Sequence, residues 1–496
     1  MAATATVAGV EVSTEHWIGG ERVGSRDTFD DRSPIDEAVI ARVARGREDE
    51  AGRAARAARD AFPGWAGTPA AERARILHAI GDGIEARVAE IAAVETLDNG
   101  SLLRSMQRSV IPRAAYNFHF FADALLALHE DDFEIRGHRN RVEWDPAGVA
   151  VVITPWNAPL MLATWRLAPA LAAGNTVVVK PPEWAPLSAS LLADVAHRAG
   201  LPDGALNVVQ GIGEEAGAAL VAHPDVDRIA FTGSVATGRL VARAAGSNLT
   251  PVSLELGGKS PLLIFADADL DAAVAQAVNQ YDNAGQVCLA GTRLLVERDV
   301  YDQFLDRFVD RATALVQGDP RRDDTAIGPL ITREHFERVD GFVRRAKEDG
   351  AKAVLGGGPN EELGGLYYRP TLFVDAPPGS EILRHEVFGP VLTLQPFADE
   401  DEAIALANDT DYGLAAIVYT GDPKRAERVS ATLIAGTVWV NCFFVRDLRA
   451  PFGGAGNSGI GREGGRYSFD FHADVKTVCT APWTANETGG KERRNG

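Results

Sequence analysis

The stretch Val149–Pro155, VAVVITP, opens the part of the sequence that decides the fold. It is a short apolar run rich in β-branched residues, and four runs of the same kind follow it. They are NTVVVKP (175–181), GALNVVQG (204–211), DRIAFTG (227–233) and PLLIFAD (261–267). Short buried strands that alternate with helices are typical of a largely parallel sheet. The sequence therefore predicts an α/β fold from residue 149 onward.

The segments before residue 149 have different patterns. Residues 48–98 are rich in Ala, Arg and Glu and carry apolar residues at helical spacing, with Thr68 expected as a helix cap and Pro69 as the first helical residue. Polar and apolar residues alternate over residues 133–144, which predicts β-structure. A helical region and a β-excursion are therefore expected to precede the first buried strand.

Composition excludes several classes of function. The 496 residues, 46% of them hydrophobic, can form an extensive core, and the length alone suggests about three domains. Lys and Arg number 50 against 69 Asp and Glu, and the net charge of −19 argues against non-specific nucleic-acid binding. No apolar run approaches the roughly 18 residues of a membrane span. We therefore expect neither nucleic acid nor membrane as a partner.

The cysteines and the two ends of the chain bear on its location. Three cysteines are too few for a disulfide framework and suit a reducing compartment. The first 17 residues lack a positively charged start, and Glu11 interrupts their apolar part, so they do not resemble a secretory signal. We expect a cytoplasmic protein, with a frayed polar tail at residues 485–496.

Two glycine-bearing turns follow predicted strands. GIGEEAG (211–217) is one residue longer than the dinucleotide fingerprint, so an ordinary strand-to-helix turn remains an equal alternative. FTGSVATG (231–238) has Arg239 where a P-loop would have Lys, and is not a nucleotide triphosphatase signature. A strand that leads through Gly233 and Ser234 into a helix would still direct backbone N–H groups at a pyrophosphate.

Seven motifs together resemble those of the NAD(P)-dependent aldehyde dehydrogenase superfamily, in the same order. They are ITPWNAPL (153–160), VVVKPPEWAP (177–186), FTGSVATG (231–238), LELGGKSP (254–261), NAGQVCLAGTR (283–293), EVFGPVL (386–392) and PFGGAGNSGIGREGG (451–465). The resemblance extends over residues 17–478. Two positions depart from the usual pattern: Val287 stands where many members have a second cysteine, and Pro182 where Ser or Ala is commoner.

Cys288 is the expected nucleophile. A cysteine thiolate attacks an aldehyde to give a thiohemiacetal, from which a hydride can pass to a nicotinamide. The alternative, a small buried hydrophobic residue, is weakened by Gly285, Gly291 and the surrounding motif. Cys442 and Cys479 lie outside any comparable group of residues.

The resemblance assigns two further catalytic residues. Asn157, with the backbone N–H of Cys288, would stabilise the oxyanion, although a turn-forming role beside two prolines is the alternative. Glu255 would be the general base that hydrolyses the acyl thioester, and its presence implies release of a free acid. Its alternative is a solvated or ion-paired glutamate, which the flanking leucines and glycines disfavour.

The resemblance also implies the cofactor contacts, with NAD preferred. Lys180 and Glu183 would hold the adenosine ribose, and the Glu183 carboxylate would repel the 2′-phosphate of NADP. Trp156 and Ser234 would approach the pyrophosphate, and Glu386 and Phe388 the nicotinamide ribose and ring. The remaining expected contacts are Ile153, Thr154, Pro155, Gly213, Gly217, Phe231, Gly233, Leu256 and Gly257. No metal site is expected.

Arginines suggest the substrate. Arg446 and Arg449 precede the glycine-rich loop, and Arg113 lies on a probable helix whose Tyr116, Phe120 and His119 could face the substrate channel. Guanidinium groups bind carboxylates in bidentate fashion. These motifs resemble the branch of 2-hydroxymuconic, 5-carboxymethyl-2-hydroxymuconic and 2-aminomuconic semialdehyde dehydrogenases of aromatic catabolism.

Each arginine has a structural alternative, a surface or inter-subunit ion pair. Because Asp447 could pair with Arg446, Arg449 is the better candidate for substrate binding. Two other functions stay open: a dehydrogenase of another aldehyde, such as a betaine, aliphatic or aromatic one, and a non-catalytic binding protein that keeps the fold.

The resemblance implies an aldehyde dehydrogenase fold: a Rossmann-like cofactor domain, an α/β catalytic domain and a small β oligomerisation element. We expect the NAD-binding domain at residues 1–126 and 146–256 and the catalytic domain at 257–460. The oligomerisation element would comprise residues 127–145 and 461–484. An isolated two-stranded excursion is marginal by itself. We therefore expect it to pair with another subunit in a homodimer or homotetramer.

Overall fold

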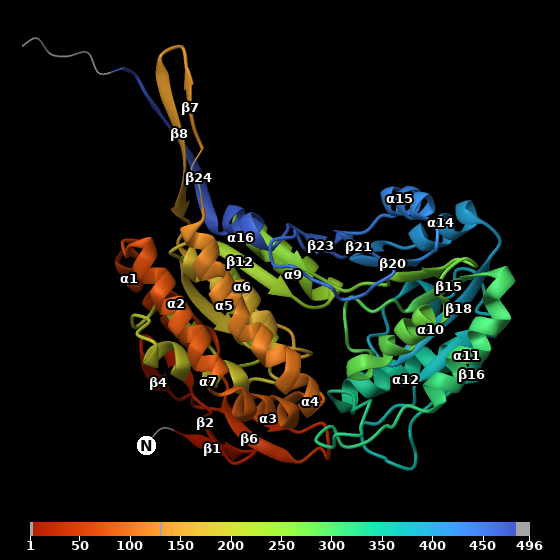
Figure 1. Cartoon of the computed structure of the whole chain (residues 1–496). Coiled ribbons are helices and arrows are strands. Elements are labelled where there is room, and N and C mark those ends of the chain that lie inside the picture. Colours follow the sequence, from red (N-terminus) through yellow and green to blue (C-terminus); the bar gives the residue numbers. More distant parts are fainter. Residues whose placement is uncertain (1–2, 129–130, 483–496) are drawn as a thin grey trace, which may run out of the picture.

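The computed structural model describes residues 3–128 and 131–482, and the tail expected at 485–496 lies outside them. Two larger sheets, each covered by helices, form the body of the protein, and a three-stranded element projects from it (Figure 1). The mixed α/β class predicted from the sequence is confirmed. No helix of the described residues is long and apolar enough to cross a membrane.

The first sheet contains four of the five predicted strands. Its order is β23-β13-β12-β9-β10-β11-β3-β4, and the strands from β13 to β11 run parallel. Their bounds are β9 Val149–Ile153, β10 Thr176–Lys180, β11 Leu206–Val208, β12 Arg228–Thr232 and β13 Val252–Glu255. Every residue of β9 and β10 is buried, as expected for central strands covered by helices on both faces.

Helices cover this sheet. They are α1 Glu48–Ala66, α2 Ala70–Glu85, α3 Val88–Asn99, α4 Leu103–Ser105, η1 Met106–Val110, α5 Ile111–Leu126, α6 Pro159–Ala172, α7 Leu187–Arg198, η2 Gly213–Gly217, α8 Ala218–Ala222 and α9 Val235–Ser247. The predicted cap of α2 is wrong by one residue. Pro69 is the cap itself, and the hydroxyl of Thr68 donates to the Gly64 carbonyl instead of capping α2.

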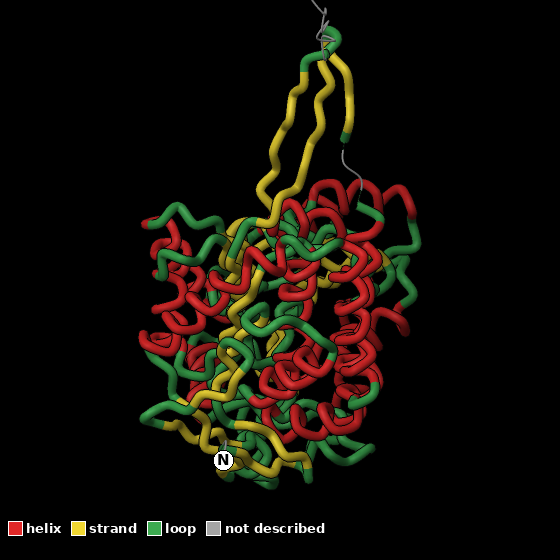
Figure 2. The backbone as a smooth tube through the Cα atoms, turned by 90° about the vertical axis from the view of Figure 1, so that its left-hand side faces the viewer, coloured by secondary structure: helices red, strands yellow, loops and turns green. Residues whose placement is uncertain are grey.

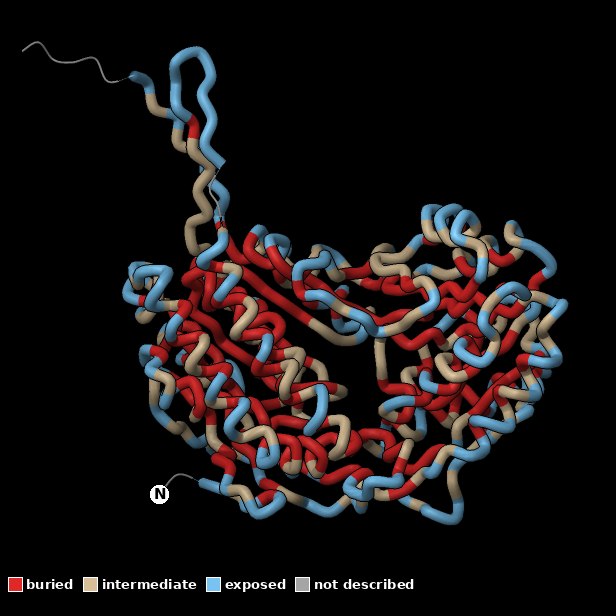
Figure 3. The backbone as a smooth tube through the Cα atoms, in the orientation of Figure 1, coloured by how far each residue is buried: buried red, intermediate tan, exposed pale blue. Residues whose placement is uncertain are grey.

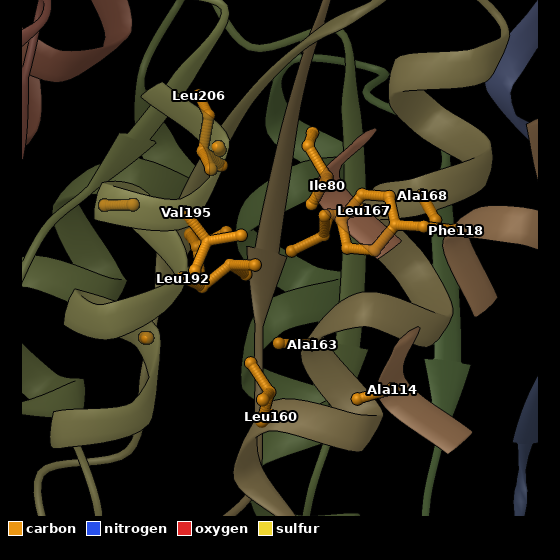
Figure 4. Packing of buried hydrophobic residues seen from close by; sticks show 14 of the residues in the cluster. Ile80, Ala114, Phe118, Leu160, Ala163, Leu167, Ala168, Leu192, Val195 and Leu206 are labelled. Atoms are coloured by element: carbon orange, nitrogen blue, oxygen red, sulfur yellow. The ribbon is translucent and has the colours of Figure 1, made fainter. Parts of the chain in front are cut away.

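The main hydrophobic core lies between α2, α5, α6, α7 and the first sheet. Figure 4 shows Ile80, Phe118, Leu167, Leu192 and Val195 converging from four of these helices. Phe118 and Leu167 are fully buried. This packing fixes the position of α5 and of the side chains that it directs toward the site.

The second sheet carries the fifth predicted strand, PLLIFAD. Its order is β16-β17-β18-β15-β14-β20-β21, with bounds β14 Pro261–Ile264, β15 Arg293–Glu297, β16 Lys352–Leu355, β17 Thr371–Val374, β18 Val391–Phe397, β20 Ala415–Tyr419 and β21 Thr437–Val440. Its helical segments are α10 Leu270–Val278, η3 Asn279–Gly285, η4 Arg298–Val300, α11 Tyr301–Thr313, α12 Arg333–Glu348, α13 Glu381–Arg384, α14 Glu400–Asn408 and α15 Pro423–Thr432. All of these elements lie within residues 257–460.

The projecting element has three strands from one chain. β8 (His138–Pro146) pairs with β7 (Asp132–Ile135) on one side and with β24 (Ala473–Thr480) on the other. The sequence predicted the two-stranded excursion and its C-terminal companion, of which the first part is helix α16 (Gly465–His472). Figure 2 shows the element extending well beyond the body, and Figure 3 shows that its tip is exposed.

The N-terminal strands were not anticipated. β3 (His16–Ile18) and β4 (Glu21–Val23) extend the first sheet, and two hairpins flank them. The hairpin strands are β1 Thr4–Val7, β2 Val10–Ser13, β5 Thr28–Arg32 and β6 Val39–Ala44. Two short strand pairs form later in the chain. β19 (Tyr412–Gly413) pairs with β22 (Ala455–Gly456), and β23 (Gly459–Ile460) pairs with β13. The last pairing returns the chain to the first sheet.

Candidate active site

A cavity of about 250 Å³ opens where the two sheets meet. Three stretches of its wall follow directly after parallel strands of the first sheet: residues 155–157 after β9, 232–234 at the end of β12 and 255–257 at the end of β13. The carboxyl ends of parallel strands are the usual position for a ligand site. The rest of the wall includes Leu162, Trp165, Arg166, Trp184, Cys288, His335, Arg338, Glu386, Phe388, Arg446 and Phe452.

Cys288 reaches the cavity from the loop between η3 and β15. Just before this loop, at the end of η3, Asn283, Ala284 and Gly285 have φ values of 51°, 55° and 72° in succession. A Cβ atom on Gly285 would lie 2.1 Å from the Gly389 carbonyl oxygen, so only glycine allows this close approach. Burial raises the pKa of the Cys288 thiol to about 12, assisted by Glu386 and Glu255 and opposed by Arg446. The thiol is therefore protonated at neutral pH.

Asn157 is held against the loop that carries Cys288. Its Nδ2 atom donates to the Gln286 carbonyl oxygen at 2.9 Å. Gln286 is fixed in turn, because its Oε1 accepts from the Ile331 N–H at 3.0 Å and its Nε2 donates to the Asn283 carbonyl at 3.0 Å. The structure thus brings the side-chain amide of Asn157 and the thiol of Cys288 to one cavity.

Glu255 is a buried carboxylate at the end of β13. Neither of its oxygens accepts a hydrogen bond from a described residue. Burial and, to a smaller extent, the nearby Glu463 raise its pKa to about 8, against the effects of Arg166, Arg446 and Arg462. A carboxyl group in this setting exchanges protons close to neutral pH, as a general acid or base must.

A buried ion pair that the sequence analysis missed lies beside Glu255. Arg166 of α6 contacts Glu463 at 2.5 Å and donates to the Thr232 hydroxyl at 3.0 Å. Ser253 donates to Glu463 at 3.0 Å. An arginine inside the apolar run MLATWRLAPALA was the available signal, because a charged residue in a buried helix requires a partner.

The expected cofactor residues divide into two groups. Pro155, Trp156, Gly233, Ser234, Leu256, Gly257, Glu386 and Phe388 line the cavity; Ile153, Thr154, Lys180, Glu183, Gly213, Gly217 and Phe231 do not. In the second group, Lys180 and Glu183 form an ion pair of 2.7 Å at the end of β10. A Cβ atom on Gly213 would approach the Glu183 carboxylate to 3.9 Å, so η2 lies next to this pair.

At two of these positions, Gly257 and Gly233, another side chain fills the space that a Cβ atom would take. A Cβ atom on Gly257 would lie 2.0 Å from Oε2 of Glu386, whose Oε1 accepts from the Gly258 N–H at 2.9 Å. A Cβ atom on Gly233 would lie 2.6 Å from the Phe231 ring. Ser234 caps α9 by accepting from the Thr237 N–H at 3.1 Å, so the positive end of this helix faces the cavity.

Two residues of α12 hold the segment that carries Glu386 and Phe388. Arg338 donates to the carbonyls of Glu386 and Val387 at 2.8 and 2.6 Å. The His335 ring bonds the Phe388 carbonyl at 2.7 Å, and Phe388 has a φ of 58°. Burial lowers the pKa of His335 to about 4, so the ring is neutral and donates. No sequence motif indicated these residues, because they lie on an ordinary amphipathic helix.

Arg446 lines the cavity without a hydrogen bond or an ion pair to any described residue. Its guanidinium lies 3.8 Å from the centre of the Phe452 ring and 4.7 Å from that of Trp165. Arg113 of α5 lies over the same Trp165 ring, at 5.8 Å. Both arginines line a smaller cavity of about 90 Å³, which shares Leu162, Trp165 and Arg446 with the first.

The preference for Arg449 over Arg446 is wrong. Asp447 pairs with Arg449, at 2.9 and 2.6 Å, and the Arg449 side chain is 81% exposed. Asp447 begins a turn that the Ala450 N–H closes on its carbonyl at 3.1 Å, and the Arg449 N–H donates to its side chain at 2.8 Å. Asp447 and Arg449 are exposed, whereas Leu448 is buried. Arg449 lines neither cavity.

The proposed direction of His119 is also wrong. It points from α5 toward α2, where its Nδ1 lies 2.9 Å from Nδ1 of His78, and it lines neither cavity. Tyr116 is 49% exposed, beside Arg113. Of the three aromatic residues, none lines the cavities described above.

Residues 22–478 match the sequence pattern of the aldehyde dehydrogenase family. The chain belongs to this family. The chain is 45% identical to a 2-hydroxymuconic semialdehyde dehydrogenase of Pseudomonas sp. (strain CF600), an alignment that covers 94% of this chain and 99% of that one. It is 43% identical to the 5-carboxymethyl-2-hydroxymuconate semialdehyde dehydrogenase of Escherichia coli, over 91% and 98% of the two chains.

Solved structures agree with this membership. A betaine aldehyde dehydrogenase from Staphylococcus aureus, in complex with NAD+, superimposes with a TM-score of 0.92 at 37% identity, over 96% of this chain and 97% of that one. The predicted resemblance and fold are thereby confirmed, and this aldehyde dehydrogenase is an enzyme.

The protonated state of Cys288 leads to a first prediction. Only the thiolate reacts with iodoacetamide. Below a pKa of about 12, the alkylation rate of Cys288 should rise about tenfold per pH unit. Arg446→Met should slow alkylation, because it removes the cation that lowers this pKa. Mass spectrometry of the Cys288 peptide, with the exposed Cys479 as internal reference, measures the rate.

The matched control is Arg449→Met, which removes an exposed arginine that is already paired. It should leave the alkylation rate unchanged. An equal or faster rate in Arg446→Met than in the unmodified enzyme would show that this guanidinium does not act on the thiol.

Proposed function

We propose that this aldehyde dehydrogenase uses NAD to oxidise a carboxylated, unsaturated semialdehyde of the muconic type, from aromatic ring cleavage, to its acid. The observation that carries the proposal is the unpaired guanidinium of Arg446 in the cavity that contains Cys288. The names of the two relatives above support the same substrate class. The second candidate, oxidation of another aldehyde such as betaine aldehyde, is favoured by the structural relative of that name.

The residues at the cavity fit a dinucleotide. The end of α9 at Ser234 suits a pyrophosphate. Lys180 and Glu183 would hold the adenosine ribose, and the Glu183 carboxylate disfavours a 2′-phosphate. The chemistry that NAD supplies is hydride acceptance by its nicotinamide ring.

The first step falls to Cys288 and Asn157. Sγ of Cys288 attacks the aldehyde carbon, and the thiol proton passes to water as the C–S bond forms. The carbonyl oxygen becomes an oxyanion, which the Asn157 amide and the Cys288 N–H stabilise. Asn157 is held in place for this role by its bond to the Gln286 carbonyl. Loss of the hydride leaves an acyl thioester on Cys288.

The second step falls to Glu255. Its unbonded carboxylate takes a proton from water, the hydroxide attacks the thioester carbon, and the C–S bond breaks to return the thiol and release the acid. With NAD as the hydride acceptor, the reaction would consume one aldehyde, one water and one oxidised NAD, and would yield one carboxylic acid, one reduced NAD and one proton.

The arginines would orient the substrate. No donor of Arg446 bonds a described residue, and its guanidinium lies beside the Trp165 and Phe452 rings, so its N–H groups are available for a bidentate contact with a carboxylate. Arg113, across the Trp165 ring, adds a second cation in the adjoining cavity. A carboxylate held there would leave the aldehyde end of the molecule toward Cys288.

A second prediction concerns the pH dependence of hydrolysis. Glu255 must be ionised to act as a base, and its pKa is raised from 4.5 to about 8. Hydrolysis should therefore be slow below this pH and increase as the pH rises through it. Glu463→Gln removes the neighbouring charge that raises this pKa, so the increase should move to lower pH. Steady-state NADH formation over the pH range measures both profiles.

Glu255→Gln is the reference variant for this experiment. It should accumulate the acyl-enzyme after a rapid NADH burst, detectable as added mass on the Cys288 peptide. Fast steady turnover of this variant at any pH would rule out Glu255 as the base.

A third prediction separates the two substrate candidates. Arg446→Ala should lower kcat/KM for 2-hydroxymuconate semialdehyde by about 10- to 100-fold, the loss of a charge-assisted hydrogen bond of about 1.5–3 kcal/mol. Arg113→Ala should act in the same direction. Arg446→Ala should cost an uncharged aliphatic aldehyde less, because that substrate loses only the effect of Arg446 on the pKa values of Cys288 and Glu255. Arg113→Ala should leave the uncharged aldehyde nearly unaffected, and Arg449→Ala should leave both substrates unaffected. Equal losses on charged and uncharged aldehydes would assign the arginines a structural role.

The assembly and location belong to the same proposal. We assign residues 1–126 and 146–256 to the NAD-binding domain, 257–460 to the catalytic domain, and 127–145 with 461–484 to an oligomerisation element. The three-stranded sheet exposes its two outer edges, which pair readily with another subunit. The chain acts as a homodimer or homotetramer in the cytoplasm, where its three free thiols are stable.

The fourth prediction tests this assembly. Multi-angle light scattering at micromolar concentration should give a multiple of the 52.8 kDa chain mass. Val475→Pro, which removes a backbone donor of β24, should shift the population toward the monomer. A monomeric unmodified protein would contradict the role given to the projecting element.

A further inference from the structure

We propose that Asn283 is a positioning residue for the side-chain amide of Asn157, and that Asn99 and Ser101, at the end of α3, complete the same network. The inference rests on the oxyanion-stabilising role proposed above for Asn157 and concerns how that residue is held. Neither Asn283 nor Ser101 lines the catalytic cavity. They would therefore act on the reaction through Asn157 and not by touching the substrate.

The segment that carries Asn157 lies between two regular elements. Residues 154–158 follow β9 and precede α6, and they belong to neither. Two side-chain amides bond the carbonyls of this segment. Nδ2 of Asn99 donates to the Trp156 carbonyl at 3.3 Å, and Nδ2 of Asn283 donates to the Asn157 carbonyl at 3.3 Å. The position of the segment thus depends on two asparagines that are distant from it in the sequence.

Asn283 and Asn157 are also joined through the residues just before Cys288. The backbone carbonyl of Asn283 accepts from the Gln286 N–H at 3.1 Å. The Gln286 carbonyl in turn accepts from Nδ2 of Asn157 at 2.9 Å. Together with the bond from the Asn283 side chain to the Asn157 carbonyl, these contacts form a closed ring. The ring holds Asn157 by its backbone and by its side chain, and the second N–H of its amide remains for the oxyanion.

Two neighbours determine the direction of the Asn283 amide. The Asn157 carbonyl can only accept a hydrogen bond, so the atom of Asn283 that faces it must be Nδ2. Oδ1 of Asn283 then accepts from the Ser101 hydroxyl at 3.0 Å. The Ser101 N–H donates to Oδ1 of Asn99 at 2.9 Å, and both of these residues are buried. Ser101 therefore links the two amides that bond the carbonyls of residues 156 and 157.

The backbone at Asn283 explains why an asparagine stands there. Its φ is 51°, and Asn adopts this left-handed conformation more readily than other residues except Gly, because its short side chain hydrogen-bonds locally. The next residue, Ala284, is buried and has a φ of 55° without that advantage. Such a conformation persists only where the surroundings impose it. Asn supplies both the required φ and the donor to Asn157, whereas Gly would supply the φ alone.

Asn283→Gly tests the proposal, because glycine keeps the left-handed backbone and removes only the side-chain amide. Stopped-flow measurement at saturating NAD should show a first turnover of NADH formation about 10- to 100-fold slower, as expected for a misplaced oxyanion donor. KM for the aldehyde should change little, since the lost interaction is made only in the transition state. The measurement uses 2-hydroxymuconate semialdehyde and hexanal in parallel, so that it does not depend on the substrate proposed above.

A double-variant cycle shows whether Asn283 acts through Asn157. Asn157→Ala should itself slow the first turnover about 100- to 1000-fold. Addition of Asn283→Gly should cause little further loss, because the side chain that Asn283 positions is then gone. A merely structural contribution would instead add its full factor. Alkylation of Cys288 by iodoacetamide forms no oxyanion, so Asn283→Gly should leave the alkylation rate unchanged.

Asn283→Asp is the second variant. It keeps the shape and the left-handed preference of Asn but places an oxygen against the Asn157 carbonyl, so it should be at least as slow as Asn283→Gly. The matched control is Asn408→Gly. Asn408 also bonds two backbone groups, the Thr432 carbonyl and the Ile434 N–H, and it lines neither the catalytic cavity nor the adjoining one. This control should leave turnover and KM unchanged.

Three results overturn the proposal. The first is an unchanged first turnover in Asn283→Gly, and the second is a loss that multiplies in full with that of Asn157→Ala. The third is an equal slowing of alkylation, because the residue would then act on the Cys288 loop as a whole. Unchanged turnover in Asn157→Ala is a separate failure, which would remove the proposed oxyanion role and this inference with it.

Discussion

Parallel pairing of β9, β12 and β13 places the segments that follow these strands at one edge of the first sheet. Asn157, Ser234 and Glu255 each stand in such a segment, although they are far apart in the sequence. The second sheet contributes the opposite wall, through the Cys288 loop and the segment at Glu386. Close backbone contact between Gly285 and Gly389 locks these two segments together. The cavity therefore depends on strand register on one side and on glycine packing on the other.

The charged groups of the cavity also affect one another's pKa values. Burial raises the pKa of Glu255 to about 8 and that of Glu386 to about 7, and it raises that of Cys288 as well. Arg166 and Arg338 are already bound to a carboxylate and to backbone carbonyls. Arg166 keeps one Nη without a hydrogen-bond partner among the described residues, and Arg446 makes no hydrogen bond to any of them. Its charge acts on the thiol and on the base at once, since it lowers the pKa of both.

The sequence motifs correctly predicted which residues meet in the cavity where the backbone next to a strand sets the position of the residue. Cys288, Asn157 and Glu255 stand in contiguous motifs next to strands, and they meet in the cavity. The sequence did not determine which way side chains point on a helix or in an irregular segment. Arg446 and Arg449 are three residues apart, and the turn at residues 447–450 leaves Arg449 outside, paired with Asp447. His119 faced α2 because the glycine at 81 left space for its ring.

Residues that act through tertiary contacts were beyond the reach of the sequence. His335 and Arg338 matter because the carbonyls of residues 386–388 lie against α12, more than 45 residues away along the chain. The N-terminal strands were missed because they are only three to six residues long and β3 joins the first sheet at a single paired position. Short elements of this kind take their conformation from the sheet edge that they join.

The cost of burying three carboxylates bears on the choice of substrate. Glu255 and Glu386 stand close to the thiol and Glu463 stands close to Glu255, and a carboxylated substrate would add a fourth acidic group. Without a compensating cation, the repulsion would keep Glu255 protonated and unable to act as a base. Arg446 offsets this repulsion from its position beside the Trp165 and Phe452 rings. A substrate carboxylate bound to Arg446 would partly neutralise the charge that lowers the pKa of Glu255. Substrate binding and the pKa of the base are therefore coupled through a single guanidinium.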